Sequence, residues 1–563
     1  MLCYSIAKLD LIMRNWDLQS KISFSEKNFN LEKLQKILLV NRGIKTKEDI
    51  KYFLDPDLES LTVANLGIDG KQLLKAVKRI REAIKKKEMI VVFGDYDVDG
   101  ICGSAILWEA LNSLKANAMP YIPHRIEEGY GLSKKGIENL KLQYPDTKLI
   151  ITVDNGIVAN ESVDFANSLG IDVVITDHHT LGKEKPKAFA IVHSTKICGA
   201  AVSWFLSKQI KNNKSNLKSD DHLGLVALAT VADVMKLTQY NRVLLVHGLP
   251  VLRETKRPGL VALTKVAAIE QNKIGVYEIG HIIGPRINAS GRIDHAMDSL
   301  RLLCTKDPKR AKTLSEKLNA TNLDRKKITL DALAHAKTFV EGRKIEKLLF
   351  VSHESYEPGV IGLIAGRLTE EYYRPSIVIS IGEVYSKASA RSVSGFNIIE
   401  FIRLSSHLLV DAGGHPGAAG FTVETSKLLE LQTFLEREAK TKIAKELLVR
   451  RLAIDCELEL PLVSDKLFSE IQKHSPFGYG NPEPTFLAKN VLIENIRIVG
   501  ADQKHLKIEL KTQSSEFKIG GILFNYDQTL GLSIGDKVNI VYAISQNEWN
   551  GSKKLELKIK DIS

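Results

Sequence analysis

The stretch that decides the fold is VVFGDYDVDGICGSAIL, residues 91–107. It completes a short apolar run, Met89–Phe93, that predicts a buried β-strand. An acidic loop follows the run, and its carboxylates are Asp95, Asp97 and Asp99. The loop leads into an apolar helical pattern, Ser104–Leu114. A buried strand, a polar loop and a helix in this order are the opening of a β-α-β unit.

The same alternation continues towards the C-terminus. Four more short apolar runs predict strands, at Ala118–Pro123, Lys148–Val153, Ile171–Thr176 and Ala188–Val192. Helical patterns lie between most of them, at Ser133–Leu142 and Ala159–Leu169. Because strands that alternate with helices at this spacing form parallel sheets, the fold class is predicted to be α/β with a parallel sheet.

The middle of the chain, residues 220–345, is mostly helical in pattern. Asp307-Pro308 has the form of an N-cap followed by proline at the first helical position, and it starts a long charged connecting helix across Lys309–Lys347. A second, smaller α/β domain is predicted beyond it. Its strands are expected at Lys347–Val351 and Ser376–Ile381, on either side of a helix at Gly359–Glu371.

The last hundred residues change character. Residues 505–511, HLKIELK, and residues 554–560, KLELKIK, alternate strictly between apolar and polar side chains. Further strands are expected at Val491–Val499, Glu516–Phe524 and Asp536–Ile544. Five short strands with turns between them predict a small closed barrel of the OB-fold type.

Length supports this division, since 563 residues correspond to about three to five domains. The predicted parts are an N-terminal segment at 1–69, the parallel-sheet domain at 70–265, a helical linker at 266–345, the smaller α/β domain at 346–445 and the barrel at 450–563. A content of 44% hydrophobic and 26% charged residues is typical of a folded globular protein and excludes disorder as the main state.

Charge and cysteine usage point to the kind of partner and compartment. Lysine and arginine number 79 against 67 acidic residues, a net charge of +12, and a basic protein is attracted to polyanions such as nucleic acid. No apolar run reaches the roughly 18–20 residues that span a bilayer, and the first ten residues do not resemble a signal peptide. The five cysteines lie far apart without a CxxC pair, which favours a reducing cytoplasm.

Acidic residues and histidines follow three of the predicted strands at their carboxyl ends. Asp95, Asp97 and Asp99 follow the strand at Met89–Phe93, and Asp154 follows the strand at Lys148–Val153. Asp177, His178 and His179 follow the strand at Ile171–Thr176. Ligands of parallel sheets bind at this edge. A later acid, Asp233, follows an apolar helical run and can join the group.

A single aspartate after a strand usually caps a helix or belongs to a turn. Acids at three strand ends are harder to explain in that way, because such a concentration of negative charge repels itself unless a cation neutralises it. Carboxylate oxygens with some imidazole suit Mn²⁺ or Mg²⁺, and several carboxylates can hold two ions about 4 Å apart. The sequence therefore predicts a two-metal centre at this edge of the sheet.

The motifs resemble those of the DHH phosphoesterase superfamily, named after the triplet Asp177-His178-His179. The ordered set comprises the opening stretch, ITVDNGI at 151–157, VITDHHTLG at 174–182 and ALATVADVMKL at 227–237. GGHPGAAG at 413–420 resembles the GGH motif of the DHHA1 domain. Narrower motifs resemble the RecJ family, bacterial single-strand-specific 5′→3′ DNA exonucleases; they are GPRINASGR at 284–292, EPGVIGLIAGRL at 357–368, SARSVSGFN at 389–397 and PFGYGNPEPTF at 476–486.

The resemblance implies a role for individual positions. The implied metal ligands are Asp97, Asp99, Asp154, His178 and Asp233, with Asp95, Asp177 and His179 as possible additions. His415 of the GGH motif would contact the scissile phosphate, which makes the implied catalytic set Asp97, Asp99, Asp154, His178 and His415. The positions implied to bind the 5′ end and the phosphates are Arg125, Arg286, Arg292, Ser389, Arg391 and His415.

The implied activity is metal-dependent, two-ion hydrolysis of phosphodiester bonds in single-stranded DNA, in recombination and repair. The barrel would add a surface for the strand, with Tyr526, Tyr542 and Trp549 available for stacking on bases. A single-strand binding protein and a RecQ-type helicase are partners implied only by the resemblance. The alternatives are a DHH oligoribonuclease or bisphosphonucleotide phosphatase, which normally lacks the C-terminal barrel, and an inactive single-strand-binding scaffold, which would have lost metal ligands.

Overall fold

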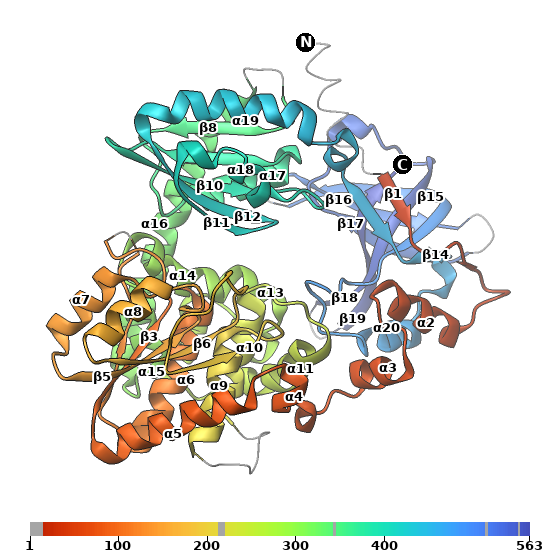
Figure 1. Ribbon diagram of the computed structural model, residues 1–563. Helices are drawn as coiled ribbons and strands as arrows, with labels where there is room; N and C mark the ends of the chain where they lie inside the picture. Colours follow the sequence, from red (N-terminus) through yellow and green to blue (C-terminus); the bar gives the residue numbers. More distant parts are fainter. Residues whose placement is uncertain are drawn as a thin grey trace. The chain divides into compact units, whose positions relative to one another are not determined.

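The computed structural model describes residues 15–125, 127–211, 220–341, 345–500, 502–512, 516–549 and 552–563. The chain forms two compact units (Figure 1). The parallel-sheet unit comprises Leu31–Asn322 and Lys466–Glu483. The barrel unit comprises the described part of Met1–Asn30 together with Leu323–Asp465 and Pro484–Ser563.

The parallel-sheet unit is built on five parallel strands in the order β4-β3-β5-β6-β7. They are β3 (Met89–Gly94), β4 (Ala118–Tyr121), β5 (Thr147–Val153), β6 (Asp172–Asp177) and β7 (Ala190–His193). The predicted parallel sheet is confirmed, and every strand lies within two residues of its predicted ends. β4 and β5, the next two strands along the chain, lie on opposite sides of β3. The strand order therefore reverses at β3, and α/β sheets bind their ligands at such a switch point.

Both faces of this sheet are covered, because successive side chains of a strand point to opposite faces. Val91 and Phe93 of β3 pack in a core with residues of α7 (Lys134–Gln143) and α8 (Asn160–Ser168). Ile90 and Val92 pack in the larger core on the other face. That core includes residues of α5 (Gly70–Lys86), α6 (Val98–Ser113), α9 (Gly199–Lys211) and α10 (His222–Ala232).

The rest of the parallel-sheet unit is helical, as predicted. Its later helices are α11 (Gln239–Arg253), α12 (Pro258–Val266), α13 (Val276–Glu278), the π-helical turn η4 (Ile279–Ile283), α14 (Gly284–Ile293) and α15 (Met297–Cys304). The predicted connecting helix is α16 (Pro308–Glu341), and the Asp307 carboxylate accepts a hydrogen bond from the Lys309 amide at its start.

The compact units group the chain differently from the predicted domains. Helices of the predicted N-terminal segment belong to the parallel-sheet unit; they are α2 (Leu31–Asn41), α3 (Lys47–Leu54) and α4 (Val63–Leu66). Residues 466–483, which the sequence placed with the barrel, belong there too. Arg242 contacts both of these segments, because its buried guanidinium donates to the carbonyl oxygens of Phe53 in α3 and of His474.

The barrel unit contains two further sheets. The first has the order β11-β12-β10-β9-β8. Its strands are β8 (Leu349–His353), β9 (Ser376–Ser380), β10 (Tyr385–Arg391), β11 (Leu409–His415) and β12 (Ala418–Glu424), with helices α17 (Ile361–Tyr372), α18 (Ile398–Arg403) and α19 (Leu428–Lys442). The sequence predicted β8, α17 and β9, but not the last three strands. The GGH motif forms the end of β11, in the hairpin that β11 makes with β12.

The predicted C-terminal barrel is confirmed. β15 (Phe486–Val499), β16 (His505–Lys511) and β17 (Lys518–Leu523) pair in sequence, and β18 (Lys537–Trp549) and β19 (Ser552–Ile562) close the barrel between β17 and β15. Residues from the start of the chain extend this unit. β1 (Asn15–Leu18) pairs with β13 (Arg451–Ile454), and β2 (Ser23–Phe24) pairs with β14 (Cys456–Leu458).

Among the described residues, none of the helices combines the length and the apolar character needed to cross a lipid bilayer.

Candidate metal centre

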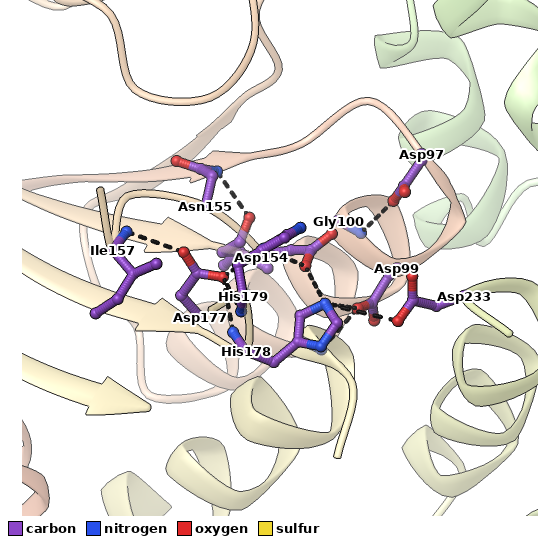
Figure 2. A network of polar contacts seen from close by, with 12 residues as sticks. Asp97, Asp99, Gly100, Asp154, Asn155, Ile157, Asp177, His178, His179 and Asp233 are labelled. Atoms are coloured by element: carbon purple, nitrogen blue, oxygen red, sulfur yellow. Dashed lines mark hydrogen bonds and ion pairs between the residues drawn. The ribbon is translucent and has the colours of Figure 1, made fainter. Parts of the chain in front are cut away.

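The carboxyl ends of β3, β5 and β6 bring their polar residues together at one edge of the parallel sheet (Figure 2). Asp95, Asp99, Asp154 and Asp177 are each at most 2% exposed. Asp233 reaches the group from the end of α10. The structure thus assembles every acid that the sequence predicted for this edge.

His178 lies at the middle of the group. Its Nε2 is 3.1 Å from Asp154 Oδ1 and 3.6 Å from both Asp99 Oδ2 and Asp233 Oδ2. Three sets of side chains place one potential ligand atom each within 4.8 Å of one another. They are Asp99, His178 and Asp233; Asp154, His178 and His179; and Asp95, Asp97 and Asp154. This clustering permits more than one metal ion.

Backbone amides fix the carboxylates of the acidic loop. Asp97 is the N-cap of α6, and its Oδ1 accepts from the Gly100 amide at 3.0 Å. Asp99 accepts from the amides of Gly199 and Ala200, at 2.6 and 2.7 Å, at the N-terminus of α9. The positive end of a helix dipole favours a negative charge at this position.

Two residues of the centre lie on strained backbone. Asp154 has φ of +63°, and Val234, directly after Asp233, has φ of +55°. A β-branched residue at positive φ is a genuine outlier, and such strain persists where the surrounding structure enforces it, often at functional sites. The Cβ atom of an alanine at position 199 would lie 2.7 Å from Asp154 Cβ, so only glycine fits beside the strained aspartate.

The electrostatics of the centre favour a bound cation. Burial, followed by repulsion from Asp99, raises the pKa of Asp154 well above its ordinary value. Burial and Asp97 do the same for the pKa of Asp95, and burial with Asp99 raises the pKa of Asp233 to about 9. Burial lowers the pKa of His178, which keeps its imidazole neutral as a metal ligand must be.

Unsatisfied oxygen atoms show the same need. Asp95 Oδ1 and Asp154 Oδ1 are buried and accept no hydrogen bond of good geometry. Buried polar atoms are normally paired, and two buried carboxylate oxygens without donors call for a positive partner. Hard oxygen donors with one or two imidazoles match Mn²⁺ or Mg²⁺. The residues therefore fit a divalent metal centre.

Asp177 makes its contacts within the protein, to backbone amides and to His179. Its Oδ2 accepts from the Ile157 amide at 2.9 Å, and its Oδ1 accepts from the His178 amide and contacts His179 Nδ1, both at 2.7 Å. It belongs to none of the metal-ligating sets. Asp177 thus orients the loop that carries the two histidines. These contacts favour an orienting role for Asp177 over the possible role as a metal ligand.

His179 lies beside the ligands and contacts them less directly. Burial alone would lower its pKa, but the hydrogen bond and the charge of Asp177 raise the pKa to about 9. Its Nε2 lies 3.1 Å from the hydroxyl of Tyr130. Sequence reasoning missed Tyr130, and it also missed Asn288, whose Oδ1 accepts from the Val98 amide at 2.9 Å. Asn288 lies within GPRINASGR, so the motif itself was the available signal.

Two of the three predicted phosphate-binding arginines of this unit lie near Tyr96, next to Asp97. The Arg125 guanidinium lies 5.0 Å from the ring centroid of Tyr96, and the charges of Arg125 and Arg292 both act on the Tyr96 hydroxyl. The third, Arg286, is engaged elsewhere, because its Nε donates to Asn319 and its Nη1 to the Ile282 carbonyl. Arg286 therefore connects α14 to α16.

The remaining predicted residues belong to the barrel unit. In β10, Arg391 Nη1 donates to Ser389 Oγ at 3.1 Å, and Gly362 leaves room for both side chains. His415 is exposed at the end of β11. In the barrel, Tyr542 is fully buried and donates to the Leu458 carbonyl, so it is not available for stacking on bases. Tyr526 is partly exposed, and the Trp549 side chain lies outside the described residues.

Three families match successive parts of the chain. Residues 89–230 match the DHH family, N-terminal domain, residues 345–441 match the DHHA1 domain, and residues 454–561 match the RecJ OB domain.

Whole-chain relatives carry the name single-stranded-DNA-specific exonuclease RecJ. The relative from Bacillus subtilis is 32% identical over 97% of this chain and 70% of its own length. The relative from Escherichia coli is 30% identical over 94% of this chain and 96% of its own length. The crystal structure of RecJ in complex with Mn²⁺ from Thermus thermophilus superposes with a TM-score of 0.82 at 27% identity, over 98% of this chain and 79% of that one. Its counterpart with Mg²⁺ gives a TM-score of 0.75 at 26% identity, over 97% and 78% of the two chains.

Proposed function

Because the chain belongs to the RecJ family of single-stranded-DNA-specific exonucleases, we propose that it hydrolyses single-stranded DNA from the 5′ end, in recombination and repair. The observation that carries this function is the convergence of buried carboxylates and His178 on one sheet edge, with two carboxylate oxygens left without donors. The centre takes Mn²⁺ or Mg²⁺, the ions found in the related structures.

We assign the metal ions to Asp97, Asp99, Asp154, His178 and Asp233, with Asp95 and His179 beside them. When bound, two such ions lower the pKa of a water molecule and neutralise the charge that develops on the phosphate. The protein's own contribution is rigidity. The amides of Gly199 and Ala200 hold Asp99, and Asp177 holds the histidine loop, so the ligands need little rearrangement.

Polarity requires a site for the 5′ end. We assign it to Arg125 and Arg292 of the parallel-sheet unit. On the family resemblance, we further assign phosphate contacts to Ser389, Arg391 and His415, which belong to the barrel unit. Arginine suits this role because its planar guanidinium grips phosphate oxygens in pairs. Arg286 is left out, since two of its donors are already used within the protein. His415 would stabilise the scissile phosphate.

The substrate partner is single-stranded DNA, and the barrel supplies a further surface for it. A single-strand binding protein and a RecQ-type helicase are proposed as protein partners on the family resemblance alone. The four described cysteines are all unpaired thiols, which supports our proposal of the reducing cytoplasm as its compartment. The family assignment and the complete set of acids disfavour both a small-substrate phosphatase and an inactive scaffold.

The experiment that tests this function follows one strand labelled at its 5′ end and another labelled at its 3′ end, with Mn²⁺ present. We expect the 5′ label to leave first as a mononucleotide, the 3′-labelled strand to shorten progressively, and the matched duplex to resist. Early release of the 3′ label, equal degradation of the duplex, or hydrolysis of dinucleotides alone would contradict the proposal.

A further inference from the structure

Exposed rings lie on the helical segment that follows α12. Tyr277 of α13 and His281 of η4 are four residues apart and face each other, with ring centroids at 4.7 Å and planes at 44°. Tyr277 is 64% exposed. The two rings therefore pack against each other at the protein surface and remain largely exposed to solvent.

The hairpin at residues 476–483 packs on the start of this segment and carries a third exposed ring. A Cβ atom at position 478 would lie only 2.6 Å from Leu237 Cδ1 and 3.1 Å from Val276 Cγ1, so the backbone of Gly478 packs tightly on both segments. The Leu237 amide donates to the Tyr479 carbonyl oxygen at 2.7 Å. The Tyr479 side chain itself is 57% exposed. We use the name ring platform for the surface formed by Tyr277, His281 and Tyr479 together with Val234 and Lys236 of the neighbouring loop.

The ring platform is continuous with the metal centre through the backbone. Val234 and Lys236 lie on the short loop that begins directly after Asp233, one of the acids that surround His178. Val234 combines two unfavourable properties, since its φ is +55° and its apolar side chain is 62% exposed. Neither property helps folding, and backbone strain of this kind collects at binding and catalytic sites.

The chemistry of the ring platform suits a polyanion with flat bases. No carboxylate lies within ion-pairing distance of the Lys236 ammonium, and the hydroxyls of Tyr277 and Tyr479 have no hydrogen-bond partner, among the described residues. The nearby carboxylate of Glu278 is used by its own helix, where it accepts from the Gly275 amide at 2.9 Å. Ring faces with an adjoining cation bind successive nucleobases and the backbone of single strands.

We propose that the ring platform stacks bases of the single strand next to the Asp233 side of the metal centre. The inference rests on the proposed function and adds to it the route of the bases within this unit. Stacking requires unpaired bases, so the ring platform would also contribute to the preference for single strands. Because every base has a π-face, we expect the contribution to depend little on sequence.

The test measures KM and kcat with Mn²⁺ on a 20-nucleotide thymidine strand, on an abasic strand of the same length and on the dinucleotide pTpT. We expect Tyr277→Ala/Tyr479→Ala to raise KM on the thymidine strand by at least about tenfold. The abasic strand and pTpT should give values within twofold of wild type. Tyr277→Phe/Tyr479→Phe keeps both rings and should restore the wild-type KM.

Leu142→Ala, at an exposed position of α7, is the control for removing an apolar surface side chain. A thymidine-strand KM within twofold of wild type in the double alanine variant would overturn the inference, while activity of the wild type would leave the proposed function intact. An equal loss on the abasic strand would also overturn it, because the rings would then act through the backbone or through a bound protein. An inactive wild type would instead contradict the proposed function.

Discussion

Single residues of the metal centre trade stability for function. Asp95 and Asp154 are buried carboxylates with raised pKa values, so each charge destabilises the metal-free protein. Asp154 adds backbone strain through its positive φ. A divalent cation relieves the charge repulsion, which couples the stability of the centre to metal binding.

We predict that Asp154→Asn stabilises the metal-free protein while it removes activity. Asparagine tolerates positive φ as well as aspartate does, and the change removes one buried charge. In EDTA the Tm should rise by roughly 2 °C, and hydrolysis with Mn²⁺ should fall by at least about a hundredfold. A calorimetric scan with a strand assay checks both. A lower Tm in EDTA would mean that the carboxylate stabilises the empty centre.

At the scale of single elements, the N-termini of two helices position the acids of the metal centre. The N-terminus of α9 donates two amides to Asp99, and Gly199 in its first turn touches Asp154. Asp97 in turn caps α6. Three acids from two strand ends are therefore positioned by two helix N-termini, whose unpaired amides need acceptors in any case.

We predict that Gly199→Ala lowers kcat with little change in the KM for a long strand. The new methyl group would meet Asp154 Cβ at 2.7 Å, and the aspartate must move. A displacement of a few tenths of an ångström should reduce hydrolysis by about tenfold to a hundredfold. Gly182→Ala, at a looser loop glycine, is the matched control and should behave as wild type. Equal kcat values for both variants would contradict this account.

Glu109 of α6 connects this helix to α10 and α12. Arg257 contacts both of its carboxylate oxygens at 2.8 Å, and His222 lies 2.8 Å away. Burial alone would raise the pKa of Glu109, but these partners lower it to about 2 from an ordinary value of 4.5. The resulting stability is fully present above about pH 5 and is lost as pH falls towards 2.

We predict that Glu109→Gln lowers the free energy of unfolding by about 3 kcal/mol at pH 7. The difference from wild type should stay constant between about pH 7 and 5 and shrink as the pH approaches 3. Urea unfolding followed by the fluorescence of Trp108 and Trp204, both in this unit, checks the prediction. A difference that grows on acidification would have the wrong sign.

The predictable part of the structure is the part that local patterns encode. The apolar runs gave the parallel sheet, and the strand-end rule gave the edge where Asp95, Asp154 and His178 meet. Tyr130 and Asn288 were missed because their roles depend on contacts with residues far away in the chain. The sequence left the placement of Tyr542 open, since a single barrel strand alternates in the same way whether its tyrosine points inwards or outwards.

At the scale of the whole molecule, the start of the chain stabilises its end. β1 and β2 pair with β13 and β14, and the Trp16 indole donates to Asp561 at 2.8 Å. Phe24 is almost fully buried in this unit. Residues 15–30 therefore stabilise the barrel unit, although the sequence showed no motif in them.

We predict that Phe24→Ala destabilises the barrel unit by about 3 kcal/mol, the usual cost of removing a buried phenylalanine. Calorimetry should show one transition shifted down and the transition of the parallel-sheet unit unchanged. Hydrolysis of pTpT should keep its wild-type kcat. A shift of the parallel-sheet transition instead would contradict the grouping of residues 15–30 with the barrel.

The claim on which the whole account depends is that the strand-end acids and His178 hold the catalytic ions. The measurement that tests it most directly is a Mn²⁺ titration followed by electron paramagnetic resonance, with hydrolysis of a labelled single strand assayed in the same samples. The account predicts about two bound ions per chain, with activity that appears as they bind, and loss of both in Asp154→Asn. Unchanged Mn²⁺ binding in that variant, or strand hydrolysis in EDTA, would contradict it.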